Sequence, residues 1–180
     1  MKQILLLEDL PEIRAWLKTL ALQVFPGAQI SESARIHDAL ELVNAVRFDV
    51  AMVDLGLPDG SGVEVVQALR EKQPDVQSVV VTIHDDDDHL FPALQAGAFG
   101  YVLKGSPSRD VLDAVAAVSE GRKYLGLGVA ELIRMSEDKD EICTALEELS
   151  ESAYAKPKKG RTGRQEFRVH GASDDLIEVD

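Results

Sequence analysis

Cysteine, basic residues and long apolar runs are all scarce in this chain of 180 residues. The single cysteine, Cys143, excludes an internal disulfide and predicts a reducing compartment. Lys and Arg number 19 against 32 Asp and Glu, and the net charge of −13 argues against non-specific nucleic-acid binding by the whole chain. The opening run MKQILLLEDL meets acids from Glu8 onward, so we expect neither a signal peptide nor a membrane span. These absences predict a cytoplasmic protein without a membrane partner.

The composition is that of an ordinary globular protein. Hydrophobic residues make up 45% of the chain and charged residues 28%, and no internal repeat is evident. The length allows one domain of common size with a remainder too short for a second full one. We therefore expect one core and an appendage.

Short apolar runs alternate with segments of helical periodicity through the first 120 residues. This alternation is typical of a parallel sheet covered by helices on both faces. The predicted strands are residues 3–7, 28–31, 49–53, 77–83 and 100–103, with a helix after each. In open sheets of this kind, ligands bind outside the carboxyl ends of the strands, so the residues at those ends are the candidate site.

Polar side chains stand at these predicted strand ends. Glu8 and Asp9 follow the first strand, Asp54 the third and Lys104 the fifth, while Thr82 lies at the end of the fourth. Three carboxylates packed together repel one another, and a hard divalent cation removes that cost. Mg²⁺ prefers oxygen ligands and accepts phosphate oxygens, so the pattern predicts Mg²⁺ at this edge, with Lys104 and Thr82 facing an anion that shares the metal.

This set of residues resembles the site of response-regulator receiver domains of two-component signalling. The resemblance covers about residues 2–120 and agrees in residue type, order and strand placement at Glu8-Asp9, Asp54, Thr82, Tyr101 and Lys104. It implies a flavodoxin-like, doubly wound, five-stranded parallel α/β sheet of order 2-1-3-4-5. The stretches DLGLPDGSG and ALQAGAFGYVLKGS resemble the subfamily whose members usually carry a C-terminal LuxR-type DNA-binding domain.

The resemblance also implies roles for these residues. Asp54 is the phosphoacceptor for a sensor histidine kinase, and Mg²⁺ is held by Glu8, Asp9, Asp54 and the backbone carbonyl of Gly56. Thr82 and Lys104 then bind the phosphoryl group. Thr82 and Tyr101 act as the switch that changes the surface offered to partners.

Each of these residues also has a plainer interpretation. An Asp after a strand is usually a turn former, Glu8-Asp9 can cap a helix, and Tyr101 can be ordinary core packing. Agreement across the whole set favours the functional interpretation. The stretch HDDDDH, residues 84–89, suggests a metal cluster at first sight, but a helix cap followed by an acidic first turn is the simpler prediction.

The resemblance ends after about residue 135, and we divide the chain into a receiver domain (1–121), a linker with a helical extension (122–153) and a disordered tail (154–180). Apolar residues at alternating spacings of three and four predict a coiled-coil seam and a homodimer. Helices that fold back on the receiver are the alternative. The residues of the seam are Leu132, Met135, Ile142, Leu146 and Leu149, with Lys139 as a polar exception.

Three functions compete. The leading one is a phosphorylation-dependent switch of partner or dimer affinity, without enzymatic turnover beyond slow self-dephosphorylation. A transcription regulator with a divergent C-terminal DNA-binding unit is the alternative, but residues 136–180 show no recognisable helix-turn-helix, and we favour a solvated tail for the basic segment KPKKGRTGR. The third is an aspartyl-phosphate hydrolase, whose nucleophile and acid would lie two residues apart after the first strand, unlike the acids here.

Overall fold

The computed structural model describes residues 1–129, 132–133, 140, 144, 165–168 and 176–179. Strands and helices alternate through the first part of the chain, because runs of β-branched and aliphatic residues are separated by amphipathic segments. The elements are β1 (Gln3–Leu7), α1 (Pro11–Val24), β2 (Gln29–Ser33), α2 (Ile36–Ala45), β3 (Val50–Val53), β4 (Gly56–Leu57), β5 (Gly60–Ser61), α3 (Val63–Lys72), β6 (Gln77–Thr82), α4 (Asp87–Ala96), β7 (Gly100–Leu103), α5 (Ser108–Ser119) and β8 (Tyr124–Leu125). None of the helices in the described ranges has the length and apolar character needed to span a bilayer.

The main sheet is parallel throughout and runs in the order β2-β1-β3-β6-β7-β8. The predicted fold is confirmed, since the five predicted strands occur in the predicted order. The sixth strand, β8, was not predicted, because two residues are too short to show a periodic pattern. Leu7 pairs with Val53 in the register of β1 and β3, so the residues that follow them, Glu8 and Asp54, leave the sheet side by side.

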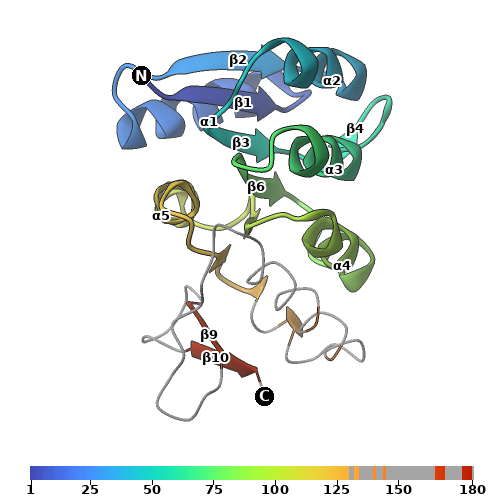
Figure 1. The fold of residues 1–180 in the computed structure, drawn as a ribbon. Coiled ribbons are helices and arrows are strands. Elements are labelled where there is room, and N and C mark those ends of the chain that lie inside the picture. The colour runs from blue at the N-terminus through green and yellow to red at the C-terminus, as the bar shows by residue number, and fades with distance from the viewer. Residues whose placement is uncertain (130–131, 134–139, 141–143, 145–164, 169–175, 180) are drawn as a thin grey trace.

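Helices cover both faces of the sheet. Figure 1 shows α1 and α5 on one side and α2, α3 and α4 on the other. Successive side chains of a strand point to opposite faces: in β1, Leu5 and Leu7 belong to the core cluster that includes residues of α2, α3 and α4, while Ile4 and Leu6 belong to the cluster that includes residues of α1 and α5. Every residue of β3 and β6 is buried, so the middle of the sheet is a rigid support for the loops at its ends.

A buried carboxylate fastens β8 to the rest of the domain. Asp110 of α5 accepts hydrogen bonds from the Tyr124 hydroxyl (2.6 Å) and the Leu127 backbone N–H (2.8 Å). A Cβ at Gly126 would lie 2.7 Å from Asp110 Oδ2, so the chain passes close to this carboxylate only because residue 126 is glycine. The division of the chain at residue 121 stays a prediction, and β8 joins the sheet from beyond that point.

The predicted dimer seam falls largely outside the described residues. Met135, Ile142, Leu146 and Leu149 all lie there, as does Lys139. Leu132 is described, and it packs against the chain's own core beside the buried Val129 and Ile133. That contact favours, at this position, the alternative in which the segment folds back on the receiver. The dimer stays a prediction.

The tail was predicted to be disordered, but its described residues form two strands. β9 (Gln165–Arg168) and β10 (Leu176–Val179) pair antiparallel, with Phe167 opposite Ile177 in the register. The paired backbone groups of β9 and β10 satisfy one another without a long apolar run that a sequence pattern would reveal. The division that makes residues 154–180 a disordered tail stays a prediction. The basic segment 156–164 lies outside the described residues.

Candidate functional site

The carboxyl ends of four strands bring the predicted site residues to one edge of the sheet. Glu8 follows β1, Asp54 follows β3, Thr82 ends β6 and Lys104 follows β7. One carboxylate oxygen from each of Glu8, Asp9 and Asp54 lies within 4.8 Å of the others. We call these three residues the acidic edge. The predicted convergence is therefore present in the fold, while the chemical roles assigned to the residues stay predictions.

Lys104 lies between two carboxylates of this edge. Its Nζ is 2.9 Å from Asp54 Oδ2 and 2.6 Å from Glu8 Oε2, and its side chain is 10% exposed. Burial by itself would lower the pKa of Lys104, but the contacts with Glu8 and Asp54 outweigh burial and raise it. Lys104 is therefore a permanently charged ammonium at the point where an anion would enter.

Glu8 is a carboxylate of this edge whose charge is costly to maintain. Burial raises its pKa and the nearby charge of Asp54 adds to the effect, while Lys104 and the Leu10 N–H (3.1 Å) oppose it. The Oε2 atom pairs with the Lys104 ammonium, whose Nζ lies 2.6 Å away. Three carboxylates whose oxygens lie within 4.8 Å of one another, two of them buried, suit coordination of a hard cation such as Mg²⁺.

Asp54 is held at the end of β3 by the backbone around it. Its Oδ1 accepts a hydrogen bond from the Leu55 N–H (2.8 Å), and its side chain is 6% exposed. The chain then doubles back through β4 and β5. A Cβ at Gly62 would lie 1.9 Å from the Asp54 carbonyl oxygen, so this return path needs glycine at residue 62.

Asp59 fastens the same loop to α2. Its two carboxylate oxygens accept hydrogen bonds from the backbone N–H groups of Ile36 (2.9 Å) and His37 (3.1 Å), at the first turn of the helix. These two bonds lower the pKa of Asp59, because they favour the charged carboxylate. The sequence suggested only a turn at this position, since the helix that Asp59 caps begins more than 20 residues earlier in the chain.

The acidic pair after β1 has its own support from α1. Arg14 Nη1 donates to the carbonyl oxygens of Glu8 (2.8 Å) and Asp9 (3.4 Å), and Arg14 Nε lies 3.4 Å from Glu32. The guanidinium thus holds the backbone of the loop rather than its carboxylates. Sequence reasoning missed Arg14, although a basic residue one turn into the helix that follows an acidic loop was a visible signal.

Gly56, the predicted carbonyl ligand, lies in β4 opposite Ser61. A Cβ at this position would come within 3.2 Å of Nε2 of His84, which belongs to the loop between β6 and α4. Glycine at residue 56 therefore leaves room for the His84 ring beside the acidic edge. This contact was invisible in the sequence, because it joins two loops that leave neighbouring strands.

The two predicted switch residues both contact the backbone of His84. Thr82 is fully buried, and its Oγ1 accepts a hydrogen bond from the His84 N–H (3.3 Å). Tyr101 is also fully buried, and its hydroxyl donates to the His84 carbonyl (2.7 Å). Burial raises the pKa of Tyr101, with the charges of Asp86 and Asp85 adding to it, so the hydroxyl keeps its proton.

The acidic stretch before α4 forms the predicted cap. Asp86 is the N-cap residue and accepts from the His89 N–H (3.0 Å), while Asp87 and Asp88 lie in the first turn. The structure also brings one ligand atom from each of His84, Asp86 and His89 within 4.8 Å of the others. We call these three residues the histidine cluster. The sequence suggested this metal-binding interpretation, but its geometry required the fold.

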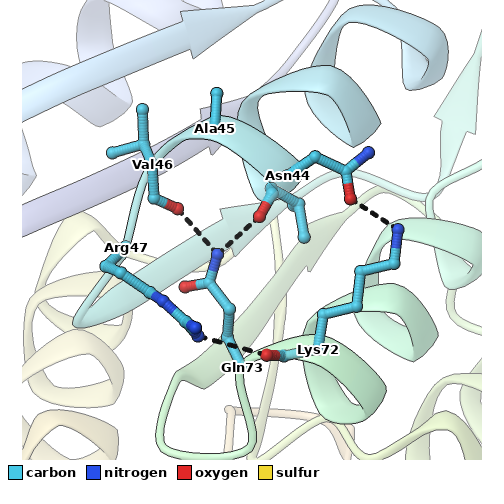
Figure 2. Close-up of a pocket in the computed structure, with 7 residues that line it drawn as sticks. Asn44, Ala45, Val46, Arg47, Lys72 and Gln73 are labelled. Atoms are coloured by element: carbon cyan, nitrogen blue, oxygen red, sulfur yellow. Dashed lines mark hydrogen bonds between the residues drawn. The ribbon is translucent and has the colours of Figure 1, made fainter.

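A separate cavity of about 150 Å³ lies between α2 and α3 (Figure 2). Gln73 donates from Nε2 to the carbonyl oxygens of Val43 and Val46 (2.7 Å each) and accepts from the Phe48 N–H (2.9 Å). Figure 2 also shows Lys72 bonded to Asn44. The buried Gln73 amide has its hydrogen bonds satisfied and links the end of α2 to the end of α3, so we assign this cavity a structural role and not that of a candidate site.

Comparisons with known proteins agree with this architecture. Residues 4–116 match the response regulator receiver domain family. The nitrate/nitrite response regulator protein NarP of Escherichia coli is 30% identical over 136 residues, which are 75% of this chain and 63% of NarP. The DNA-binding transcriptional activator DevR/DosR of Mycobacterium tuberculosis is 35% identical over 96 residues, which are 53% of this chain and 44% of that protein. The chain thus spans less than two thirds of the length of these relatives.

Among solved structures, a two-component response regulator of the LuxR family from Aurantimonas superimposes with a TM-score of 0.66 at 27% identity. The alignment covers 74% of this chain and 96% of that one. Residues 4–116, which match the receiver domain family, make up more than half of the chain and include the whole acidic edge and Lys104. The chain therefore belongs to the response regulator receiver domain family of two-component signalling proteins.

Proposed function

We propose that this protein accepts a phosphoryl group on Asp54 from the phosphohistidine of a sensor histidine kinase, and that phosphorylation changes its affinity for a partner. The observation that carries the proposal is the convergence of Glu8, Asp54 and Lys104 within ion-pair distance at one edge of the sheet. We infer a cytoplasmic location, where such a kinase domain would be met.

The chemistry requires an oxygen nucleophile on a rigid support. In the proposed step, an Asp54 carboxylate oxygen forms a bond to phosphorus, the phosphorus–nitrogen bond breaks, and its electron pair stays on the imidazole nitrogen of the kinase. The product on Asp54 is an acyl phosphate. Because Leu55 N–H holds Oδ1, Asp54 keeps one orientation throughout this step.

Lys104 and Thr82 would receive the phosphoryl group. The Lys104 ammonium already contacts Asp54 Oδ2, and an arriving phosphoryl oxygen would replace that carboxylate oxygen as its partner. The Thr82 hydroxyl accepts a bond from His84 N–H, and a hydroxyl that accepts one bond can also donate its own proton to a phosphoryl oxygen. The chain thus offers one charged and one neutral donor.

Mg²⁺ fits the acidic edge, and we propose Glu8, Asp9 and Asp54 as its protein carboxylate ligands, with the carbonyl of Gly56 as a fourth. When bound, the ion supplies neutralisation of the negative charge that gathers on the phosphoryl oxygens. Glu8 contributes a buried carboxylate, and Arg14 holds the loop that carries Glu8 and Asp9.

Thr82 and Tyr101 would transmit the change. If the Thr82 hydroxyl turns toward a phosphoryl group, the loop that begins at His84 follows it, because Thr82 bonds the His84 N–H. Tyr101 holds the carbonyl of the same residue, so its position reports the position of that loop. We propose that partners read this rearrangement on the surface around α4 and β7.

The test is intact-mass measurement after incubation with acetyl phosphate and Mg²⁺. We expect a gain of one phosphoryl group in the native protein and none in Asp54→Asn, while Asp85→Asn, which changes an exposed acid in the neighbouring loop, keeps the gain. An equal gain in the native protein and Asp54→Asn would place the phosphoacceptor elsewhere. Slow loss of the group is compatible with the proposal, whereas turnover of a generic phosphate ester would contradict it.

DNA binding is a second candidate, because the name of the relative DevR/DosR describes a DNA-binding transcriptional activator. The sequence argued against it, since residues 136–180 show no recognisable helix-turn-helix. A mobility-shift assay at low salt with the phosphorylated chain and its own promoter decides between the two. A shift that Asp54→Asn abolishes supports DNA binding, and no shift removes it for this chain.

A further inference from the structure

The histidine cluster (His84, Asp86 and His89) is the feature that the proposed phosphoryl chemistry leaves unused. The His84 and His89 rings stack with centroids 3.7 Å apart and planes 2° from parallel. His89 Nδ1 lies 2.6 Å from Asp86 Oδ1. The side chains of His89 and Asp86 are 40% and 48% exposed, so a dissolved ion can reach them. We propose that the histidine cluster binds a divalent transition-metal ion, with Zn²⁺ as the representative.

The ligand types determine which ion each group of residues selects. Imidazole nitrogens suit Zn²⁺, Cu²⁺ and Ni²⁺, whereas carboxylates without imidazole suit Mg²⁺. The histidine cluster offers two imidazoles and one carboxylate, and the acidic edge offers three carboxylates. One domain therefore carries two neighbouring groups of ligands that select different classes of metal.

The local charge favours a cation at the histidine cluster. A helix N-terminus carries about half a positive elementary charge, which opposes a cation. Here Asp86 caps α4, Asp87 and Asp88 follow in the first turn, and Asp85 precedes them. Four carboxylates outweigh the helix dipole several-fold, so the field at the start of α4 is negative.

Binding requires a defined change in the two rings. The lone pairs of imidazole nitrogens lie in the ring planes, so two parallel stacked rings do not direct them at one point. The rings must turn out of the stack while Asp86 turns a carboxylate oxygen toward the ion. Half-exposed side chains have the space to turn. Glycine at residue 56 adds to this space, because a Cβ there would lie 3.2 Å from His84 Nε2. Loss of the stack is therefore a signature of metal binding.

The position of His84 gives such a site a structural consequence. Its N–H bonds Thr82 Oγ1 and its carbonyl accepts from Tyr101, so an ion held by its side chain restrains the loop between those two residues. Any effect of that restraint on signalling rests on the proposed function. The metal site itself does not, because none of its ligands belongs to the acidic edge.

The test is calorimetric titration of Zn²⁺ into the full chain carrying Cys143→Ser, in the presence of excess Mg²⁺. This substitution removes a thiol that would compete for zinc, and the Cys143→Ser chain is the parent of the variants below. We expect saturable binding to His84, Asp86 and His89, at least tenfold weaker in the double variant His84→Gln/His89→Gln. His37→Gln is the matched control, because His37 also lies beside two acids but has no second imidazole. It should bind Zn²⁺ as the parent does.

A second measurement separates these ligands from other zinc sites. NMR spectra should show Zn²⁺ shifting the ring resonances of His84 and His89 together, as the stack breaks, with His37 unchanged. Equal Zn²⁺ affinity in the parent and the double variant, or ring shifts that spare His84, would overturn the proposal. Repeating the titration in Asp54→Asn keeps the outcome independent of phosphorylation, since that variant retains every ligand of the histidine cluster.

Discussion

The acidic edge and the histidine cluster each bring three ligand-bearing side chains within 4.8 Å, but they differ in burial and in how their polar atoms are satisfied. Glu8 and Asp54 of the acidic edge are buried and depend on Lys104 for charge compensation. In the histidine cluster, Asp86 satisfies the backbone and side chain of His89 and stays half exposed.

This difference predicts which of the two sites contributes to the stability of the folded domain. Burying a charge costs several kcal/mol unless a partner compensates it, so the acidic edge carries an electrostatic cost that a bound cation can reduce further. A half-exposed cluster carries no such cost. We therefore expect substitutions in the acidic edge to change stability as well as function, and substitutions of His84 and His89 to change metal binding alone.

The largest effect should come from Gly62→Ala. The added Cβ would lie 1.9 Å from the Asp54 carbonyl oxygen, and backbone atoms on both sides must move to avoid it. We expect at least about 3 kcal/mol of lost unfolding free energy, together with lost phosphoryl acceptance, measured by denaturant unfolding and intact mass. Gly105→Ala is the control, because its Cβ would meet nothing within 4 Å. Equal stability of the two variants would contradict the close packing described for Asp54.

Lys104→Met should cause the second largest loss of stability. It leaves Glu8 and Asp54 buried without their ammonium partner, and the loss of one member of a buried ion pair typically costs about 3 kcal/mol. Mg²⁺ should restore part of the loss, since a ligand that binds only the folded chain stabilises it. Lys18→Met, which breaks a more exposed pair with Glu32, should cost far less. A Lys104→Met protein as stable as Lys18→Met without Mg²⁺ would mean that the acidic edge carries no strain.

A smaller effect should appear in the pH dependence of stability without divalent ions. Burial raises the pKa of Glu8 above its ordinary value of 4.5, so the folded chain holds this proton more tightly than the unfolded chain. The resulting contribution is fully present below pH 4.5 and is lost as the pH rises through the raised pKa. Glu8→Gln should flatten this decline, whereas Glu12→Gln, at the exposed start of α1, should leave it unchanged. An identical decline in Glu8→Gln would assign it to another group.

The smallest change in stability should come from His84→Gln/His89→Gln. These side chains are partly exposed and the backbone bonds of His84 remain, so we expect a change within about 0.5 kcal/mol. Zn²⁺ should raise the thermal midpoint of the native protein and leave that of the double variant unchanged. A large loss of stability without metal would show that the histidine cluster is structural, and would erase the contrast with the acidic edge.

The residues of the acidic edge could be predicted because their signal is local. Each follows a short apolar run, and the alternation of runs with helical stripes predicts parallel strands whose ends share one edge. The predicted partners Glu8, Asp54 and Lys104 are accordingly in contact. Arg14, Asp59 and Gly62 were missed or only partly understood, because their roles are contacts between loops, and loop paths follow from no periodicity.

By itself, the sequence determined the alternation of strands and helices, the two-faced core and the set of polar residues at the strand ends, because side-chain periodicity and strand polarity are properties of short segments; the order of the strands in the sheet was expected only from the family resemblance. Only the tertiary structure decided that Gly62 lies against the Asp54 carbonyl, that Asp59 caps α2, that Asp110 fastens β8, and that His84 stacks on His89 between the two switch residues. Such contacts depend on where loops from different strands meet in space, which is set by the packing of the whole domain.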